Sequence, residues 1–426
     1  MDALVLTAIL LLFFALGAPI AIAIGVAGVA ALLWQGDFSL MMVIQRLYAG
    51  ADSFPLMAVP LFVLAGLLME AGGLSGRIVR MAESLVGWLP GGLAAVAIVS
   101  AMFFAGITGS AAADTAAVGG ILIPEMIRRG YGRGFSAAVQ AAGGSLGVVI
   151  PPSIPMILFG FLTGVSISEL FAAGILPGVL IGASLVGVSV AVSSRAGYGG
   201  AGSFSGVEFL SALWEAKWAL GAPIVVLGGI LGGIFTATES ASIAVFYALA
   251  VGIGIHRELK WREMVGMVIR AALLSSVVLF IIATASVFSW LMAIQEVPHR
   301  VAFWLKSLTD SPAVLLLLIN VLLLVVGTFV ETTAALILLV PVLMPLLPHL
   351  QIDLVQLGAI IIVNLSIGML TPPLGICLVV SSGIADTPLE KAVSQLVPFF
   401  VILILDLMII TYWPPLTLWL PGLLRN

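Results

Sequence analysis

The sequence predicts an all-helical membrane protein that crosses the bilayer several times and contains two related halves. Hydrophobic residues make up 62% of the 426 residues and charged residues only 8%, far below the roughly one quarter typical of soluble domains. Apolar stretches of spanning length, about 20 residues, recur between short polar connections. In each half, glycine, proline and hydroxyl residues interrupt two of these stretches. An unbroken membrane helix would not be expected to contain such residues at these positions.

Composition argues against several other kinds of protein. The single cysteine, Cys377, cannot form a disulfide within the chain. His256, His299 and His349 lie far apart at expected helix ends, so a metal-ligand cluster is not expected. No histidine falls within an expected span, and Ser-His, His-Glu-x-x-His and paired-aspartate signatures are lacking, so the sequence does not predict an enzyme. The apolar run at the N-terminus has no basic segment before it, which favours a retained span over a cleaved signal peptide.

Residues 1–92 are expected to form scaffold helices and an amphipathic arm. Leu4–Leu33 is too long for a single ordinary span, and Gly17 and Pro19 interrupt it, so it could form one kinked element or two. A span is expected at Pro55–Ala71. The charged stretch that follows is amphipathic, which favours an orientation along the membrane surface.

Residues 93–165 are expected to form the first half of a transport domain. Within them, 93–126 is apolar but broken near Gly106–Ser110, which predicts a re-entrant hairpin that enters and leaves on one side. Three arginines within 128–133 place that side in the cytoplasm by the positive-inside rule. A broken transmembrane helix is expected at 135–165.

Residues 166–310 are expected to form scaffold spans, and they contain a glycine- and serine-rich linker at 196–206 and a second amphipathic arm. The second transport half is expected at 311–385. It comprises a re-entrant hairpin at 311–347 and a broken helix at 355–383, and residues 386–426 are expected to form a C-terminal helix.

The interrupted regions of the two halves match at one shift. Gly106 corresponds to Gly327, Ser145 to Ser366, and the double proline at 151–152 to that at 372–373, each 221 residues apart. Five crossings are expected between the two hairpins. Because five is odd, the second hairpin should enter from the opposite face, which predicts inverted repeats of the kind found in secondary transporters.

Four motifs resemble one transporter family: Phe104–Asp114, Ile150–Pro155, Gly233–Glu239 and Asn364–Gly375. Over nearly its whole length the chain resembles the large membrane (M) subunit of tripartite ATP-independent periplasmic (TRAP) transporters. The resemblance implies sodium-driven uptake of an organic acid, delivered by a soluble periplasmic binding protein, across the bacterial inner membrane. It also implies a separate small membrane subunit with four helices.

Sodium favours oxygen ligands, and a hairpin tip beside an unwound helix offers several carbonyl and hydroxyl oxygens together. The sodium-site candidates share this setting; they are Gly106, Thr108, Ser110, Ser145 and Gly147 in the first half and Gly327, Thr328, Thr332, Asn364, Ser366, Gly368 and Thr371 in the second. The alternative is that these small residues only let helices pack closely.

Ser110 and Glu331 occupy equivalent positions at the two tips, and the resemblance implies that this region faces the substrate. Asp114 and Ser153 are further substrate candidates. Glu331 could also cap the second arm of its hairpin, and Asp114 could bind the backbone of its own hairpin. The family often has aspartate where Glu331 stands and hydroxyl residues where Gly143-Gly144 stand, so sialic acids, C4-dicarboxylates and other carboxylates all remain open as substrates.

Two further carboxylates have different expected roles. Glu239 lies at a tight turn between spans and is expected to cap a helix. Asp406 lies inside the last span, so it is expected to contact another helix or the small subunit.

The expected mechanism is of the elevator type, in which both hairpins and their broken helices move against a fixed scaffold. The alternative is a stand-alone Na⁺/dicarboxylate symporter or anion exchanger with the same inverted hairpins.

Overall fold

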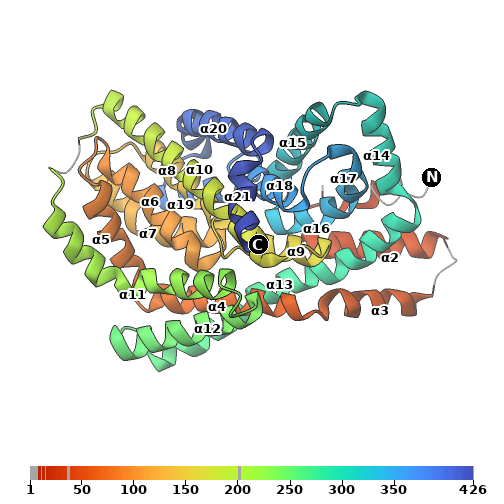
Figure 1. Cartoon of the computed structure of the whole chain (residues 1–426), viewed down its shortest axis with the longest axis horizontal. Coiled ribbons are helices and arrows are strands. Elements are labelled where there is room, and N and C mark those ends of the chain that lie inside the picture. The colour runs from red at the N-terminus through yellow and green to blue at the C-terminus, as the bar shows by residue number, and fades with distance from the viewer. Residues whose placement is uncertain (1–7, 11, 15, 36–38, 200–202, 426) are drawn as a thin grey trace.

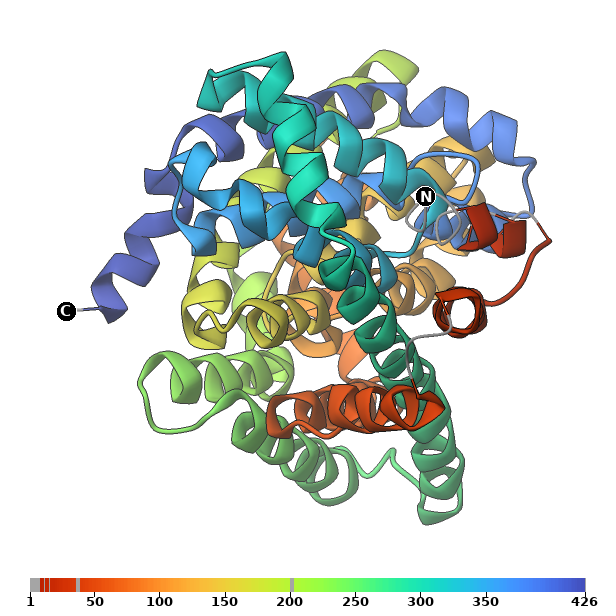
Figure 2. The same cartoon turned by 90° about the vertical axis from the view of Figure 1, so that its right-hand side faces the viewer.

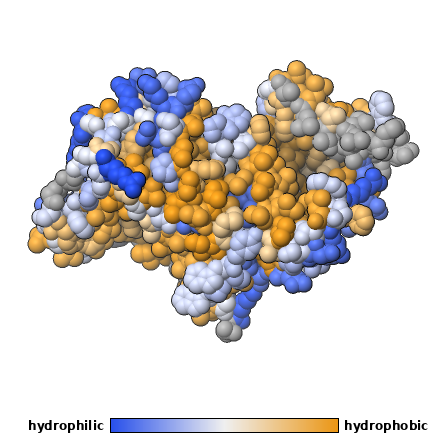
Figure 3. Space-filling model, turned by 90° about the horizontal axis from the view of Figure 1, so that it is seen from above, coloured by the Kyte–Doolittle hydropathy of each residue, from blue (hydrophilic) through white to orange (hydrophobic). Residues whose placement is uncertain are grey.

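A computed structural model describes residues 8–10, 12–14, 16–35, 39–199 and 203–425. Every regular element in this part of the chain is helical (Figure 1). Eight of the described helices are long and apolar enough to cross a membrane. Figure 3 shows a broad hydrophobic surface with hydrophilic residues gathered toward the edges of the view. The chain is therefore a multi-pass membrane protein.

The first apolar run forms two helical pieces rather than one. Its helical residues within 8–14 end in a turn at Leu16 and Gly17, and α2 then covers Ile20–Gln35. Gly17 has φ +74°, which a glycine adopts without the steric cost of a side chain. Pro19, just before α2, suits a helix start because proline has no N–H that would need a partner. Residues 1–7, 11 and 15 lie outside the described residues.

The remaining helices of the N-terminal region are short. They are α3 (Leu40–Ala51), the 3₁₀ turn η1 (Phe54–Met57), α4 (Ala58–Ala71) and the predicted amphipathic arm α5 (Leu74–Val86).

The first hairpin and its broken helix have the predicted interruptions. Helices α6 (Gly92–Thr108) and α7 (Ala111–Arg128) are joined at Gly109, whose φ of +63° ends α6. Next, α8 (Arg133–Ser145) and the 3₁₀ turn η2 (Leu146–Val148) stop before the double proline, and the chain resumes as α9 (Ile154–Thr163).

The second hairpin and broken helix follow the same plan. The hairpin consists of α15 (Pro312–Phe329) and α16 (Thr332–Leu343), extended by η4 (Met344–Leu346) and α17 (Leu347–Leu350). The broken helix consists of α18 (Leu354–Gly368) and α19 (Ile376–Ala385). Both double prolines have a cis peptide bond between their two prolines.

The other helices connect and flank these units. They are α10 (Ile167–Ala196), α11 (Gly206–Leu231), α12 (Ala237–Leu249) with the π-helical η3 (Ala250–Ile255), α13 (Trp261–Ile294), the second arm α14 (Val297–Leu308), α20 (Leu389–Tyr412) and α21 (Pro415–Leu424). Glu239 forms a capping box with Thr236 at the start of α12, which confirms its predicted role. The predicted linker joins α10 to α11, and its residues 200–202 lie outside the described part.

The shift of 221 residues also relates the helix bounds of the two halves, to within about two residues at most ends. It carries α6 onto α15, α8 onto α18 and α9 onto α19. It further carries the start of α10 onto that of α20, a correspondence that the motifs did not indicate. The C-terminal region contains one more helix than predicted, because α21 follows α20 after a break at Pro414.

Most of the helices fall into two packing groups, and α5 packs against one member of each, α6 and α11. In the first, α10 packs against α6, α9, α18, α20 and α21, while α20 also packs against α8. The other helices of the hairpins and breaks belong to it as well, because α7 packs against α8 and α19, α15 against α18, and α16 against α9. In the second, α13 packs against α2, α3 and α4, and α12 packs against α4 and α11. Figure 1 shows α3, α4, α11 and α12 below the helices of the first group, and Figure 2 shows α13 running obliquely across the molecule.

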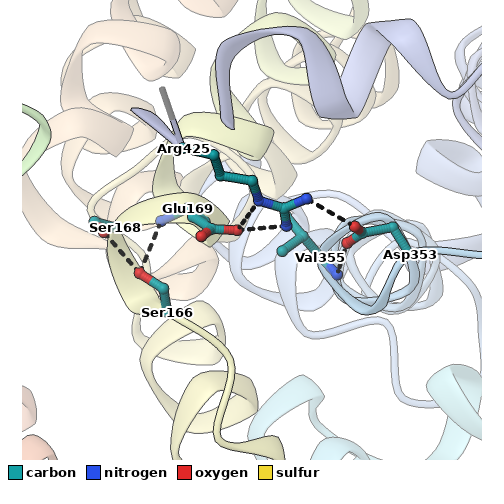
Figure 4. Close-up of polar contacts among 6 residues, drawn as sticks. All are labelled: Ser166, Ser168, Glu169, Asp353, Val355 and Arg425. Atoms are coloured by element: carbon teal, nitrogen blue, oxygen red, sulfur yellow. Dashed lines mark hydrogen bonds and ion pairs between the residues drawn. The ribbon is translucent and has the colours of Figure 1, made fainter. Parts of the chain in front are cut away.

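An ion-pair cluster joins three helices of the first group (Figure 4). The Arg425 guanidinium, at the end of α21, lies 2.6 Å from the Glu169 carboxylate in the first turn of α10 and 3.0 Å from that of Asp353. Asp353 also caps α18 by accepting from the Val355 N–H at 2.8 Å. The cluster therefore ties the C-terminal helix to both halves of the chain.

This cluster predicts a pH-dependent contribution to stability. Burial opposes ionisation of Asp353, but the hydrogen bonds from Arg425 and Val355 outweigh it and lower the pKa of Asp353. A lowered pKa stabilises the folded state above the ordinary aspartate value of about 3.9, and this stabilisation is lost as the pH falls through the folded-state value. At neutral pH, Arg425→Gln should cost at most about 1 kcal/mol, because these side chains are partly exposed.

Thermal unfolding of the purified chain at neutral and acidic pH measures this effect. The difference between Arg425→Gln and the natural chain should shrink at acidic pH. Arg195→Gln is the control, because Arg195 has no ion pair with any described residue. A difference that is the same at both pH values would contradict the assignment.

Candidate functional site

Both hairpin tips line one cavity of about 430 Å³. Thr108–Ala113 approach it from the first tip, and Glu331 and Thr333 from the second. Val148 and Met369, beside the two helix breaks, also line it, and α2, α4 and α13 supply the opposite wall. Segments about 220 residues apart in the sequence thus meet at a single site.

The first tip is held by one buried carboxylate and one backbone bond. The Ile154 N–H donates to the Gly109 carbonyl at 3.4 Å, which joins the tip to the chain after the double proline. The Thr108 hydroxyl donates to Asp114 Oδ1. Asp114 is fully buried, and its Oδ2 has no hydrogen-bond partner among the described residues. The Asp114 carboxylate therefore accepts a hydrogen bond from a side chain of its own hairpin. The sequence had suggested a bond from the hairpin backbone instead.

The second tip is capped by Glu331. Its carboxylate accepts from the Thr333 N–H at 2.9 Å and from the Ala334 N–H at 3.4 Å, which confirms the predicted cap. The Leu374 N–H donates to the Thr328 carbonyl at 3.1 Å, the counterpart of the bond at the first tip. The hydroxyl of Thr332 is buried and lacks a partner among the described residues.

The two helix breaks have equivalent serines and closely packed glycines. Ser145 Oγ donates to the Ala142 carbonyl at 2.8 Å, and Ser366 Oγ to the Val363 carbonyl at 2.7 Å. A Cβ on Gly147 would lie 2.5 Å from Asp114 Oδ2, and one on Gly368 would lie 2.7 Å from the backbone of Gly327. Each broken helix therefore contacts its hairpin directly.

Only three of the predicted site residues line the cavity itself, namely Thr108, Ser110 and Glu331. The remainder lie behind the tips and in the breaks; they are Gly106, Asp114, Ser145, Gly147, Ser153, Gly327, Thr328, Thr332, Asn364, Ser366, Gly368 and Thr371. Ser153 is buried, where it donates to the Val148 carbonyl at 2.6 Å and caps α9. Asn364 Nδ2 donates to Asn320 Oδ1 at 2.9 Å, so its N–H group already has a partner, whereas its Oδ1 has none among the described residues.

A family model described as "Tripartite ATP-independent periplasmic transporter, DctM component" matches residues 7–416. The chain belongs to this family.

Two relatives cover almost all of this DctM-family chain. The 2,3-diketo-L-gulonate TRAP transporter large permease protein YiaN of Escherichia coli is 42% identical over 402 residues, which are 94% of this chain and 95% of the relative. The isethionate TRAP transporter permease protein DctMQ of Oleidesulfovibrio alaskensis is 42% identical over 96% of this chain. The match covers 65% of that relative's own length. Both relatives are permeases, and the DctM-family chain is a transport permease rather than an enzyme.

A solved structure is similar in fold. The YdaH transporter of Alcanivorax borkumensis has a TM-score of 0.54 with 16% sequence identity, and the match covers 90% of this chain and 89% of that one.

The cavity of the DctM-family chain is acidic. Glu70 and Glu331 line it, and the described lining residues include no lysine, arginine or histidine. Sequence reasoning missed Glu70, which lies in the last turn of α4 and faces the tips from the second packing group. The signal that could have found it is a charged residue inside an expected span, since such residues mark functional sites by default.

Asp406 is buried within α20, away from the cavity. Ser184 Oγ of α10 donates to Asp406 Oδ1 at 3.0 Å, so the predicted contact with another helix is confirmed. The other carboxylate oxygen has no partner among the described residues.

Proposed function

We propose that this chain is the large membrane subunit of a sodium-driven transporter that takes up an organic acid across the bacterial inner membrane. The acid would be delivered by a periplasmic binding protein, and a small four-helix subunit would complete the membrane part. The single observation that carries this proposal is the acidic cavity at which both hairpin tips meet.

Charge balance explains why cations should accompany the substrate. An organic anion that enters a cavity lined by Glu70 and Glu331 meets like charges, and the described lining residues offer it no basic side chain. Burying an unbalanced charge away from water is costly. Sodium ions would balance both the cavity carboxylates and the anion. Each net positive charge that moves inward gains roughly 2.3 kcal/mol per 100 mV of membrane potential.

The oxygen atoms behind the tips suit sodium. Asp114 Oδ2, Thr332 Oγ1 and Asn364 Oδ1 are buried without partners among the described residues. In the first half, Asp114, Thr108 and Ser145 would hold an ion together with carbonyls near Gly106 and Gly147. In the second half, Thr328, Thr332, Ser366 and Thr371 would do so together with carbonyls near Gly327 and Gly368. Bound ions would fix the tips in place beside the substrate.

The moving part of the proposed elevator comprises the first packing group. The sequence prediction assigned α10 to the scaffold and set α20 apart as a C-terminal helix. Their packing against α6, α8 and α18 supports placing both with the hairpins. The second packing group would then be the fixed scaffold. The five crossings expected between the hairpins remain the argument for an inverted arrangement of the two halves.

The substrate class that we propose is broader than the carboxylates expected from the sequence. The two relatives are named for 2,3-diketo-L-gulonate, a carboxylate, and isethionate, a sulfonate. We propose a small polar organic acid of either kind. Ser110 would donate a hydrogen bond to it from the first tip, whereas the Thr333 hydroxyl already donates to Glu331 Oε1 at 3.0 Å.

Reconstitution into liposomes tests the proposal. The chain, its small subunit and the cognate binding protein should together take up a labelled acid only when a sodium gradient is directed inward. The acid would be found by a thermal-shift screen of the binding protein. Uptake without the binding protein or the small subunit would instead favour a stand-alone symporter or exchanger, and uptake without sodium would refute sodium coupling.

The equivalent serines of the two breaks provide a sharper test of sodium binding. The double variant Ser145→Ala, Ser366→Ala removes one oxygen from each proposed ion site. The sodium concentration for half-maximal uptake should rise by about 5–150-fold, the usual range for linked binding. Ser189→Ala is the matched control, because its hydroxyl makes the same kind of bond to a carbonyl three residues back but lies in α10. An unchanged sodium dependence in the double variant would remove these serines from the sites.

A further inference from the structure

A second cleft, of about 530 Å³, adjoins the tip cavity toward the arginine-rich end of α7, which the positive-inside rule predicts to be cytoplasmic. Glu70 lines both spaces. Helix α7 also lines both, with Ala113 in the tip cavity and Ala116, Ala117 and Gly120 in the cleft. The position of a Cβ on Gly120 has no atom within 4 Å. One face of small side chains therefore leads from the tip into the cleft, over about 10 Å at 1.5 Å per residue.

The cleft contains positive charge, unlike the described lining of the tip cavity. Arg77 and Arg80 of α5 are among its lining residues. The Arg77 guanidinium donates to the Gly73 carbonyl at 2.6 Å and to Glu258 Oε1 at 2.8 Å, and its side chain is 20% exposed. Arg80 pairs instead with Glu215 at 2.9 Å and is far more exposed. Arg77 is therefore the better-fixed cationic group of this cleft.

Glu258 places a carboxylate against the start of α5. A Cβ on Gly73 would lie 1.7 Å from Glu258 Oε2. Gly73 has φ +77° and provides no side-chain cap for α5, and uncapped N–H groups at a helix start attract anions. His256 Nδ1 lies 2.9 Å from the Gly72 carbonyl, which holds the loop that contains Glu258 in place.

Ser75 is a second sign that a ligand fits here. It belongs to the first turn of α5 and lines the cleft. Its residue is 7% exposed, and its hydroxyl has no hydrogen-bond partner among the described residues. A guanidinium, a helix start and an unsatisfied hydroxyl thus lie around a position that an internal carboxylate already occupies.

From this geometry we propose that the Arg77 end of the cleft is a release station for the transported organic acid, which Glu258 occupies until the acid displaces it. This inference rests on the proposed function. The acid leaves the tip cavity past Glu70, which repels it, and reaches Arg77, which binds its anionic group. Because one carboxylate replaces another at Arg77, the acid binds only weakly and leaves readily for the cytoplasm.

Hydrogen exchange of the purified full-length chain tests the station, with sodium succinate as the probe and sodium chloride at equal ionic strength as the reference. Succinate should slow exchange at residues 73–77. Glu258→Gln should lower the succinate concentration needed by about 10-fold, because it removes a competing charged hydrogen bond. Arg77→Gln should abolish the protection at 73–77. Glu215→Gln is the matched control, since it breaks only the Arg80 pair and should leave the response unchanged.

The same measurement, repeated with choline salts in place of the sodium salts, separates this inference from the proposed function. Residues 108–114 and 328–334 report on the tip cavity, and their sodium-dependent protection should persist in Arg77→Gln. If succinate does not protect 73–77 in Glu258→Gln, the station is refuted whatever the tips do. If 73–77 respond but the tips do not respond to sodium in any variant, the proposed sodium sites fail instead. Should Arg77→Gln not fold, Glu258→Gln and Glu215→Gln still decide the outcome.

Discussion

Glu331→Gln is expected to reduce sodium-driven uptake by about 10-fold or more, which corresponds to roughly 1.4 kcal/mol. The amide keeps an oxygen that can accept from the Thr333 and Ala334 N–H groups, so the start of α16 should remain capped. It lacks the negative charge that the proposed sodium ions would balance at the second tip. Initial uptake rates in liposomes, measured over a range of sodium concentrations, give the result.

Two more variants separate the charge of Glu331 from its capping role. Glu331→Asp keeps both features and should retain most of the uptake. Glu331→Ala removes both and should also lower stability, by about 1 kcal/mol, the usual cost of losing a cap. If Glu331→Gln transported normally while Glu331→Ala did not, Glu331 would be a cap alone and its substrate-site assignment would be wrong.

Gly147→Ala is expected to destabilise the first half and to stop uptake. The new methyl group would lie 2.5 Å from Asp114 Oδ2 and 2.9 Å from the backbone of Ala111. Because backbone atoms at the start of α7 cannot turn aside as a flexible side chain can, the hairpin tip must move. Overpacking of this kind costs typically 1–3 kcal/mol. Thermal unfolding of the purified chain and uptake in liposomes measure the two effects.

Gly187→Ala is the matched control for this prediction. Gly187 lies inside α10, and a Cβ there would have no atom within 4 Å. Alanine favours a helix over glycine by up to about 1 kcal/mol, so this variant should be as stable as the natural chain or slightly more so. If Gly147→Ala were equally harmless, close contact between η2 and the hairpin could not be what holds the first tip.

The interrupted helices could be predicted because their signal is local. The double prolines interrupt a membrane helix and the glycines weaken it. The same breaks recur 221 residues later in the chain, which supports each prediction with the other. The cap at Glu331 followed from its place before two threonines. The break within Leu4–Leu33 was visible at Gly17 and Pro19, but whether it kinked or divided the run depended on backbone angles that residue types alone leave open.

Other features depend on which helices pack together, and the sequence carries little trace of that. Glu70 stands outside every motif, and only the approach of α4 to the first tip brings it to the cavity. There, a Cβ on Gly66 would lie 3.4 Å from Thr108. Similarly, the sequences of α10 and α20 are those of ordinary apolar spans. Only the packing of the folded chain shows that both helices lie beside the hairpins and broken helices. The partner of Asn364 is Asn320, which lies in an apolar run with no motif to mark it.

The connection between α14 and α15 limits how the proposed moving part can travel. It consists of Thr309–Ser311, and Thr309 (φ −161°, ψ 143°) and Ser311 (φ −79°, ψ 118°) are already extended. A residue spans at most about 3.5 Å, so this three-residue connection can hardly lengthen further. Any large displacement of the second hairpin must therefore swing α14 itself, a rigid lever of about 18 Å at 1.5 Å per residue. The length of α14, rather than the flexibility of a loop, would therefore limit how far the second hairpin moves during transport.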